Sequence, residues 1–303
     1  MSVSTHRLTN GYRQYAAWLY RLATQRQRAN LHRQLIECSG FPVAILFYHR
    51  VADTHLTPWT ISRRNFAAHL DWLEQNFDIV TLTEAQRRVR SRVNARPTVA
   101  ITFDDGYAEN CDFAIPELQR RKLPATYFVA TESVISGTSF AHDLKVNCSF
   151  APNSVAEIRD IARAGFDIGG HTKNHVDIGQ IAERDAVEDE ILGGIRELET
   201  WGAGPIKYFS FPFGLPRNTS QLAVDILLEA GLSGFCTAYG AWNWPGSQGY
   251  HLRRIHADPG MQTLKNWLTL DARKLRDPYA LPFREPAWPL QQVTEGSEQL
   301  SAV

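Results

Sequence analysis

The sequence has no excess charge of either sign, few cysteines and no long apolar run. Its 303 residues carry 32 lysines and arginines against 32 aspartates and glutamates, and 44% of them are hydrophobic. A disordered chain would be less apolar and more charged, and a collagenous chain would exceed 20 glycines and 15 prolines. The neutral balance also argues against nucleic acid as a partner. An ordinary globular protein remains, long enough for one large domain with extensions.

Sequence features that mark secretion or membrane insertion are also missing. The N-terminal segment lacks the uninterrupted apolar stretch of a secretory signal, because Arg13 and Arg21 bracket its apolar run. No segment approaches the roughly 18 consecutive apolar residues of a membrane span. The cysteines form no C-x-x-C pair, so we expect reduced thiols and a cytoplasmic location. They are Cys38, Cys111, Cys148 and Cys236.

Residues 8–36 are predicted to form one or two helices outside the main domain. Residues 1–40 hold six arginines and one acid, Glu37. Either its apolar face covers the main domain and the arginines face solvent, which is the commoner use of such a helix, or it lies on an anionic membrane surface with Trp18 at the headgroup boundary. The apolar face gathers residues at three- and four-residue spacing, namely Tyr12, Tyr15, Ala16, Leu19 and Leu22.

From Phe41 onward, short apolar runs alternate with helical segments, a pattern typical of βα units around a parallel sheet. Helical spacing covers Arg63–Asn76 and Glu183–Trp201, and Thr81–Glu84 has the form of a capping box that opens a helix at Glu84. The predicted strands are Val43–Tyr48, Val99–Phe103, Ala125–Val129, Phe166–Gly169, Lys207–Phe211, Gly234–Ala238 and Leu252–His256.

We therefore predict an α/β fold, a distorted (β/α) barrel of about seven or eight units over residues 41–275. An N-terminal helical extension (1–40) precedes it, and a frayed C-terminal tail (276–303) follows it. Four apolar runs end at polar groups, and because the C-terminal strand ends of a barrel open on one face, these groups are expected to converge. They are His49, Asp104-Asp105, His171 and Pro212-Phe213-Gly214.

Two clusters carry the candidate chemistry. His171 and His175 are four residues apart, and with the Asp105 carboxylate they make the ligand set of a catalytic divalent metal with open positions. Asp104 and Asp105 are adjacent and point in different directions, so that one can bind a metal while the other addresses water. The alternative interpretation of Asp104–Gly106 is a plain turn, since Asp-Gly is a common turn dipeptide.

These motifs resemble those of the polysaccharide deacetylases of carbohydrate esterase family 4, the NodB-homology domain. T-F-D-D-G is intact at Thr102–Gly106, and H-[ST]-x-x-H is intact at His171–His175. The third motif, usually R-x-P-Y-G, is altered at Ser210–Gly214. The resemblance covers about Phe41 to Leu270 and implies a TIM-like barrel of the NodB-homology type.

The resemblance implies metal-dependent removal of an N-acetyl group from an amino sugar in a polysaccharide or glycolipid precursor, as in exopolysaccharide synthesis. It implies that Asp105, His171 and His175 hold the metal, Zn²⁺ first and Co²⁺, Ni²⁺ or Fe²⁺ as alternatives. It also implies Asp104 as the general base and the backbone N–H of Phe213 as the oxyanion donor.

Two histidines are candidates for the general acid. Phe47–Val51 contains the Y-H-R motif of a subgroup similar to the poly-N-acetylglucosamine deacetylases of biofilm systems, which implies His49. Leu252–His256 is a rough match to the C-terminal L-x-H motif of other members, which implies His256. We favour His49, because its motif match is fuller and histidine suits proton donation at neutral pH.

The remaining predictions concern the substrate. Since Ser210 replaces the third-motif arginine, another cation, Arg254, is expected to act on Asp104. The expected partner is an N-acetylated glycan or a lipid-linked amino sugar. The alternatives are a deformylase or amidase acting on a lipid-linked sugar or a small non-sugar amide, and a non-catalytic glycan-binding relative. Substrate contacts are predicted for Pro212, Trp242, Trp244 and Arg254, with Gly240–Gly246 as a binding loop.

Overall fold

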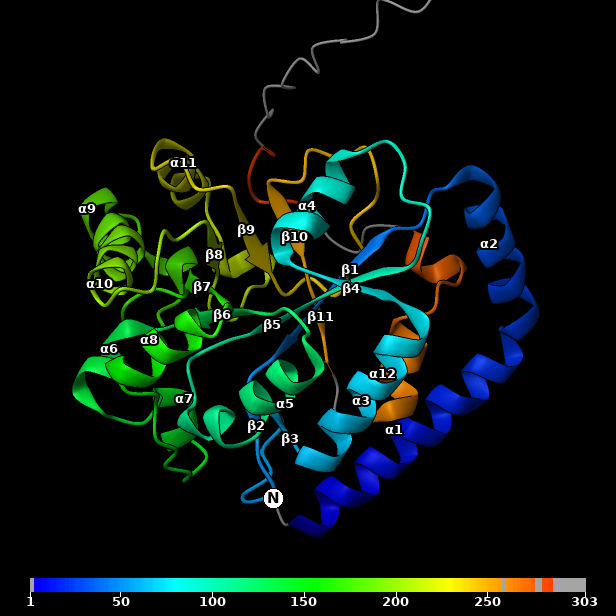
Figure 1. Ribbon diagram of the computed structural model, residues 1–303, viewed down its shortest axis with the longest axis horizontal. Coiled ribbons are helices and arrows are strands. Elements are labelled where there is room, and N and C mark those ends of the chain that lie inside the picture. Colours follow the sequence, from blue (N-terminus) through cyan, green and yellow to red (C-terminus); the bar gives the residue numbers. More distant parts are fainter. Residues whose placement is uncertain (1–2, 258–259, 276–279, 286–303) are drawn as a thin grey trace, which may run out of the picture.

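The apolar runs from Phe41 onward form one parallel sheet in the computed structural model, which describes residues 3–257, 260–275 and 280–285. The sheet path is β10-β9-β8-β7-β6-β5-β1-β11, and each neighbouring pair is parallel. Strands β10 and β11 follow each other in the chain, and β10 pairs with β9 whereas β11 pairs with β1. Together they form one interrupted strand, called the closing stave below, between β9 and β1 (Figure 1). The strands are β1 (Val43–Tyr48), β5 (Thr98–Phe103), β6 (Thr126–Val129), β7 (Asp167–Gly170), β8 (Tyr208–Ser210), β9 (Gly234–Thr237), β10 (His251–Arg253) and β11 (Ile255–His256).

The predicted fold class and its strands are confirmed. All six residues of β1 and of β5 are buried, because helices cover the outer face of the barrel and side chains fill its interior. The last predicted strand is interrupted at Arg254, which lies between its two halves. Three short strands were not predicted: β2 (Arg50–Val51), β3 (Thr60–Ile61) and β4 (Asp78–Val80).

Three helical segments around the barrel were predicted, at 63–76, from 84 and at 183–201, and the last two need corrections. The helix predicted from Glu84 begins at Leu82, and only half of its capping box forms, because the Glu84 carboxylate pairs with Arg87 and Arg88. The stretch 183–201 is helical but contains a π-helical turn, η3 (Asp189–Gly193). The helices are α3 (Arg63–Asn76), α4 (Leu82–Arg90), α5 (Ala114–Arg121), α6 (Thr131–Ser136), α7 (Ala141–Leu144), α8 (Val155–Arg163), α9 (Arg184–Glu188), α10 (Gly194–Thr200), α11 (Gln221–Glu229) and α12 (Met261–Trp267), and the 3₁₀ turns are η1 (Ala108–Asp112), η2 (Ile178–Gln180), η4 (Pro216–Asn218) and η5 (Ala272–Leu275).

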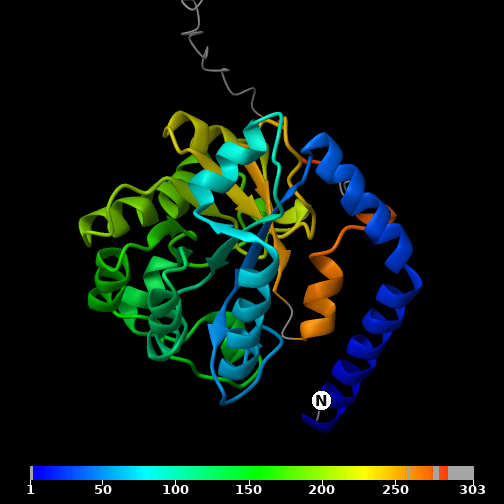
Figure 2. The ribbon, with the colours of Figure 1, turned by 45° about the vertical axis from the view of Figure 1, so that its right-hand side comes forward.

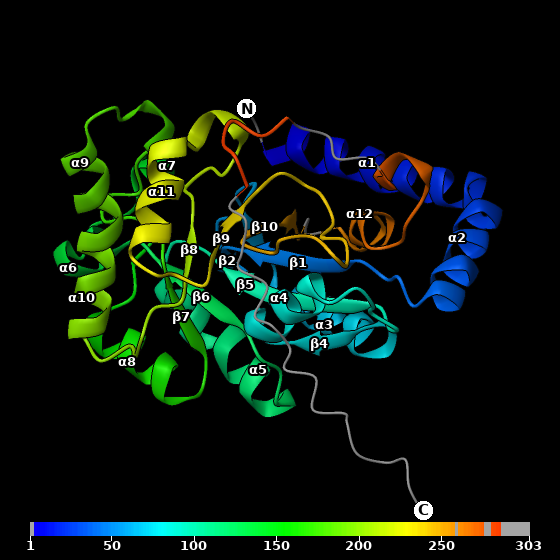
Figure 3. The ribbon, with the colours of Figure 1, turned by 90° about the horizontal axis from the view of Figure 1, so that it is seen from above.

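The N-terminal segment forms two helices, α1 (Val3–Ala23) and α2 (Gln25–Cys38), along the outside of the barrel. Figures 1 and 3 both show α1 beside α12. The expectation that the apolar face covers the barrel is wrong, and only some of the arginines face solvent. Arg21 and Arg28 bond to the α12–η5 segment, whereas Tyr12 is 75% exposed.

The predicted frayed tail is ordered in part. Phe283 is buried, with its ring against those of Phe235 and His251, and Glu285 pairs with Arg253. Residues 280–285 therefore pack on the barrel, and the prediction is wrong for them. The rest of the predicted tail falls largely outside the described residues. Within the described ranges, no helix has the length and apolar character to span a membrane.

Candidate metal and catalytic site

The polar groups that follow β1, β5, β7 and β8 converge, as predicted, on one cavity of about 310 Å³. The close approach follows from the barrel, in which the C-terminal strand ends meet on one face. The lining residues are Phe47, His49, Pro58, Trp59, Asp104, Asp105, His142, His171, His175, Phe211, Phe213, Ala238, Arg254 and His256.

Asp105, His171 and His175 form a group whose ligand atoms all lie within 4.8 Å of one another. The Oδ1 atom of Asp105 is 3.4 Å from His171 Nε2 and 3.1 Å from His175 Nε2. Asp105 is 1% exposed, and neither of its carboxylate oxygens has a hydrogen-bond partner among the described residues. A buried carboxylate in this state is costly unless a cation compensates it. The trio therefore fits a divalent metal ion.

The ring orientation of His171 supports the same interpretation. Its Nδ1 is 2.7 Å from the carbonyl oxygen of Ser210, which can only accept a hydrogen bond. In the neutral ring Nδ1 therefore carries the proton, and the lone pair on Nε2 faces Asp105. A carbonyl that fixes the tautomer in this way is the usual support of a metal-binding histidine.

The loop between the two histidines is held by Glu190 from the π-helical turn η3. The Oε2 atom of Glu190 accepts the backbone N–H groups of Lys173 (3.1 Å) and Asn174 (3.0 Å). Its Oε1 atom accepts the Asn174 amide at 2.7 Å. A Cβ at Gly194 would lie 3.3 Å from the backbone of Thr172, so the absence of a side chain lets the helix approach the loop. Sequence reasoning missed Glu190, because nothing local links it to His171.

Backbone strain is concentrated at this site. Four non-glycine residues beside the cavity have positive φ: Asp105 (73°), Thr172 (61°), His175 (53°) and Phe213 (60°). Such residues cost free energy and persist only where the surrounding structure enforces them, which is common at active sites. The fold thus maintains backbone strain at one carboxylate residue, Asp105, and at one imidazole residue, His175.

Asp104 is paired with Arg254 by two buried hydrogen bonds. Nη1 of Arg254 donates to Oδ1 at 2.7 Å, and Nη2 donates to Oδ2 at 2.8 Å. Nη2 also donates to Ser210 Oγ at 2.7 Å, so the short side chain at the third-motif arginine position makes room for this guanidinium. Burial alone would raise the pKa of Asp104, but Arg254 and the neighbouring imidazoles outweigh it and lower that pKa.

Both candidate acids line the cavity. The ring centroids of His49 and His256 are 6.1 Å apart. Burial lowers the pKa of His49 to about 4, opposed by the carboxylates of Asp105 and Asp104. The imidazolium form of His49 thus depends on negative charge in the cavity.

The arginine of the Y-H-R motif has a supporting position. Arg50 is 1% exposed and pairs with Glu109. It also donates to the carbonyl oxygen of Thr54 at 2.9 Å, and its guanidinium lies 3.7 Å from the Phe150 ring centroid. These contacts fix the loop that brings Trp59 to the cavity.

His142 is a cavity residue that sequence reasoning missed. Its Nε2 is 2.8 Å from the Tyr107 hydroxyl and 3.5 Å from Oδ2 of Asp105. The buried Asp143 accepts from the same hydroxyl (2.9 Å) and from Trp59 Nε1 (2.9 Å). No motif or regular spacing in the sequence connects His142 or Asp143 with Asp105 or Trp59. The only signal was the tyrosine that follows the T-F-D-D-G motif.

Of the predicted substrate contacts, Arg254 and the Pro212–Phe213 segment lie at the site, and the tryptophan loop does not. Asn243 pairs with Val43, the first residue of β1, so Trp242 and Trp244 lie toward the opposite end of the barrel. Trp242 is buried there. Pro212 is buried beside the cavity, and the Phe213 N–H makes no backbone hydrogen bond within the described residues.

Comparisons with known proteins point to the polysaccharide deacetylases. The polysaccharide deacetylase family model matches residues 91–234. YxkH of Bacillus subtilis (strain 168) is described as a polysaccharide deacetylase. It is 25% identical to this chain over 222 residues, which is 72% of each chain. The structure of IcaB from Ammonifex degensii superposes with a TM-score of 0.63 at 25% identity, covering 76% of this chain and 97% of that one. The Streptococcus pyogenes deacetylase PplD, solved with acetate, shares the fold, with a TM-score of 0.63 at 18% identity over 76% and 99% of the two chains.

Proposed function

Since residues 91–234 match the polysaccharide deacetylase family model, we propose that this chain is a metal-dependent hydrolase that removes N-acetyl groups from amino-sugar units of a glycan. The observation that carries the proposal is the buried, unsatisfied Asp105 carboxylate facing the His171 and His175 nitrogens. Beside it stands a second carboxylate, Asp104, which Arg254 keeps ionised. A purely structural turn would not require two adjacent buried acids with these different partners.

The proposed chemistry divides among the cavity residues. A divalent ion at the trio supplies Lewis acidity toward the amide carbonyl and toward water. Asp104 accepts the proton of the water that attacks the acetyl carbon. The N–H of Phe213 donates to the oxygen that becomes negatively charged. His49 gives a proton to the amide nitrogen as the carbon–nitrogen bond breaks, which releases acetate and the free amine.

The shape of the cavity supports an amino sugar as the reacting unit. Its volume of about 310 Å³ is at the lower end of small-molecule sites, which suits one sugar ring with its acetyl group. Trp59 and Phe213 present aromatic surface on its walls. We infer that a single sugar unit enters, while the rest of a glycan lies along the rim.

Acetate release from N-acetylglucosamine oligomers tests the proposal. The purified protein is stripped with a chelator and then supplied with Zn²⁺ or Co²⁺. We expect the metal to restore release in the wild type. Asp104→Asn should retain the metal without turnover, whereas His171→Ala should lose both metal and turnover.

The same assay separates the alternatives. No release in the presence of a stoichiometric metal would contradict the glycan substrate and favour a lipid-linked sugar or a small amide. Failure to bind any divalent ion would contradict the assignment of Asp105, His171 and His175. Full turnover in Asp104→Asn would contradict Asp104 as the base.

A further inference from the structure

Helix α1 is packed onto the barrel by its polar side. Three polar side chains of α1 and α2, spaced seven residues apart, form hydrogen bonds with the segment that starts at α12. They are Gln14, Arg21 and Arg28. Nε2 of Gln14 donates to Thr263 Oγ1 at 2.7 Å, and Nη1 of Arg21 donates to the carbonyl oxygen of Lys265 at 2.6 Å. A helix that merely covered a core would place apolar residues along this line.

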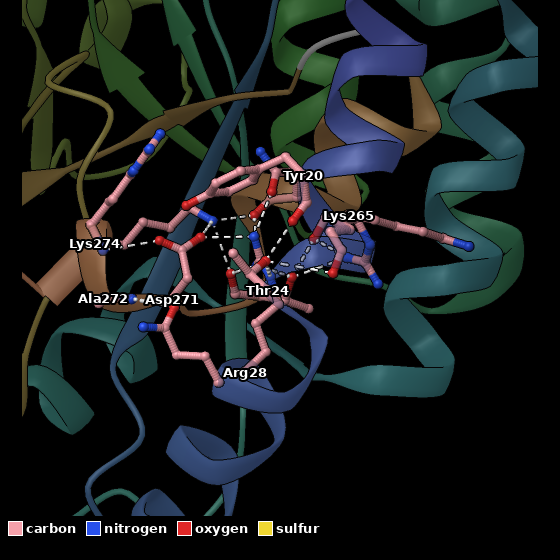
Figure 4. Close-up of polar contacts among 12 residues, drawn as sticks. Tyr20, Thr24, Arg28, Lys265, Asp271, Ala272 and Lys274 are labelled. Carbon is pink, nitrogen blue, oxygen red and sulfur yellow. Dashed lines mark hydrogen bonds and ion pairs between the residues drawn. The ribbon is translucent and has the colours of Figure 1, made fainter.

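The polar contact fixes the rotation of the helices about their axes. Figure 4 shows Arg28 and Lys274 directed at Asp271. Each is 2.7 Å from the Asp271 Oδ2 atom, and the Asp271 side chain is 1% exposed. Nη2 of Arg28 also donates to Asn266 Oδ1 at 2.6 Å. Turning the helices to bury their apolar side would leave the Asp271 carboxylate without Arg28.

Next to this polar line, α1 carries an exposed apolar surface, and we call it the outer stripe. Tyr15 and Trp18 stack on it with ring centroids 5.8 Å apart. Figure 2 shows that no other described element lies outside α1. The exposed fractions are 75% for Tyr12, 58% for Tyr15, 44% for Trp18, 44% for Leu19 and 50% for Leu22.

We propose that the outer stripe docks on an anionic lipid surface. The segment through Gly40 has six arginines and one acid, on a chain that is neutral as a whole. Exposed Arg13, Arg26 and Arg33 therefore meet a negatively charged surface favourably. Docking on the same helix of a second copy would bring two basic segments together, so charge disfavours a dimer. Tyrosine and tryptophan suit the boundary between headgroups and acyl chains.

The placement of α1 connects this surface to the cavity. Figures 1 and 2 show α1 beginning at the end of the molecule where β2 and β3 lie. Strand β2 directly follows His49 and strand β3 directly follows Trp59, and both of these residues line the cavity. Docking through α1 thus holds this end of the barrel near the bilayer. The inference stands apart from the proposed chemistry, because no residue of the outer stripe lines the cavity.

Vesicle sedimentation with the 303-residue chain tests the proposal. The vesicles contain phosphatidylcholine alone or phosphatidylcholine mixed with phosphatidylglycerol. We expect binding to the mixed vesicles that weakens as NaCl rises from about 0.1 M to about 0.5 M. Leu19→Ser/Leu22→Ser should lower the partition coefficient about tenfold or more. The matched control is Val93→Ser/Ile135→Ser, which changes two other exposed aliphatic residues (60% and 52%) and should bind as the wild type does.

Two further measurements keep the outcome decisive. Brominated lipid should quench a fluorescence component that Trp18→Phe lacks. Acetate release from soluble oligomers should be equal in all variants, which separates this test from that of the proposed function. Equal vesicle binding by the Leu19/Leu22 variant and the wild type would overturn the proposal. The proposal would also be overturned if the wild type were a dimer without lipid and the Leu19/Leu22 variant a monomer. The outer stripe would then bind a second copy of the chain and not a lipid surface.

Discussion

Asp104 and Arg254 show how one altered motif position is compensated by a residue far along the chain. Arg254 is 1% exposed and bonds to both carboxylate oxygens of Asp104, so neither charge is left unpaired. Its guanidinium also lies 4.6 Å from the Phe47 ring centroid. Ser210 accepts from the same group and occupies the place where a longer side chain would collide with it. The charge next to the proposed base is thus retained.

The acid limb of the pH profile depends on this pair. Arg254 favours the carboxylate form of Asp104, whereas burial favours the neutral acid. In Arg254→Gln only the neighbouring imidazoles still oppose burial, so the pKa of Asp104 rises and activity is lost at higher pH on the acid side. We expect the acid limb of kcat/KM to move up by about 1–3 pH units.

Two variants control this prediction. Arg254→Lys keeps the positive charge and should move the limb less than Arg254→Gln does. Arg253→Gln removes the neighbouring arginine, which pairs with Glu285 instead, and should leave the limb in place. An unchanged acid limb in Arg254→Gln would show that Arg254 does not set the ionisation of Asp104.

The acid assignment of His49 is tested by changing the leaving group. His49→Ala should slow amide cleavage by about 10²–10⁴-fold. It should slow cleavage of an activated acetyl ester much less, because that leaving group needs little protonation. His256→Ala is the matched control, since His256 lines the same cavity. If His256→Ala shows the selective loss and His49→Ala does not, the two assignments are exchanged.

At the scale of elements, the π-helical turn η3 positions the loop that carries both imidazoles. The turn projects Glu190 toward the loop, where it binds the backbone of Lys173 and Asn174. π-turns inside α-helices are frequent at functional sites. Here the turn links the outer helix layer to the loop of the expected metal ligands.

Metal affinity should respond to Glu190 although it contacts no metal ligand side chain. Glu190→Ala releases the backbone of the His171–His175 loop, so we expect the Kd for Zn²⁺ to rise about 10–100-fold. Titration calorimetry measures this change. Glu188→Ala alters a neighbouring acid of the same helical segment that pairs with Arg184 and should bind Zn²⁺ normally. Equal affinities in the two variants would contradict the positioning role.

Elements differ in how fully the sequence predicts them. The barrel strands were predictable, because strands buried on both faces appear as continuous apolar runs. The apolar face of α1 was predictable too, but its direction was not. Periodicity shows that Tyr12, Tyr15 and Leu22 share a side, whereas Asp271, some 240 residues later, decides which side packs inward. Glu190 and His142 escaped prediction for the same reason, since their partners come from other segments.

At the scale of the whole molecule, the barrel core and the metal trio contribute to stability separately. The core is continuous around the sheet without the trio, so the metal-free chain should remain folded. Zn²⁺ at about 100 times its Kd should add about 2.7 kcal/mol to the free energy of unfolding. For a chain of this size we expect Tm to rise by about 5 °C, as measured by calorimetry. In His171→Ala the same addition should leave Tm unchanged.

The cytoplasmic location and the natural glycan remain predictions, as do the extension (1–40) and the barrel (41–275) as separate units. The predicted tail (276–303) is corrected at residues 280–285, which pack on the barrel. The remaining predictions follow from composition and motifs and not from contacts between residues.

The interruption of the closing stave at Arg254 also orders events during synthesis on the ribosome. All three expected metal ligands and Asp104 lie within residues 104–175, and they leave the ribosome about 80 residues before Arg254 does. A nascent or truncated chain that ends before β10 therefore has the ligands for a metal but not the counter-charge of the proposed base. On the proposed mechanism, full activity near neutral pH therefore requires the final strands, although all the expected metal ligands are synthesised before them.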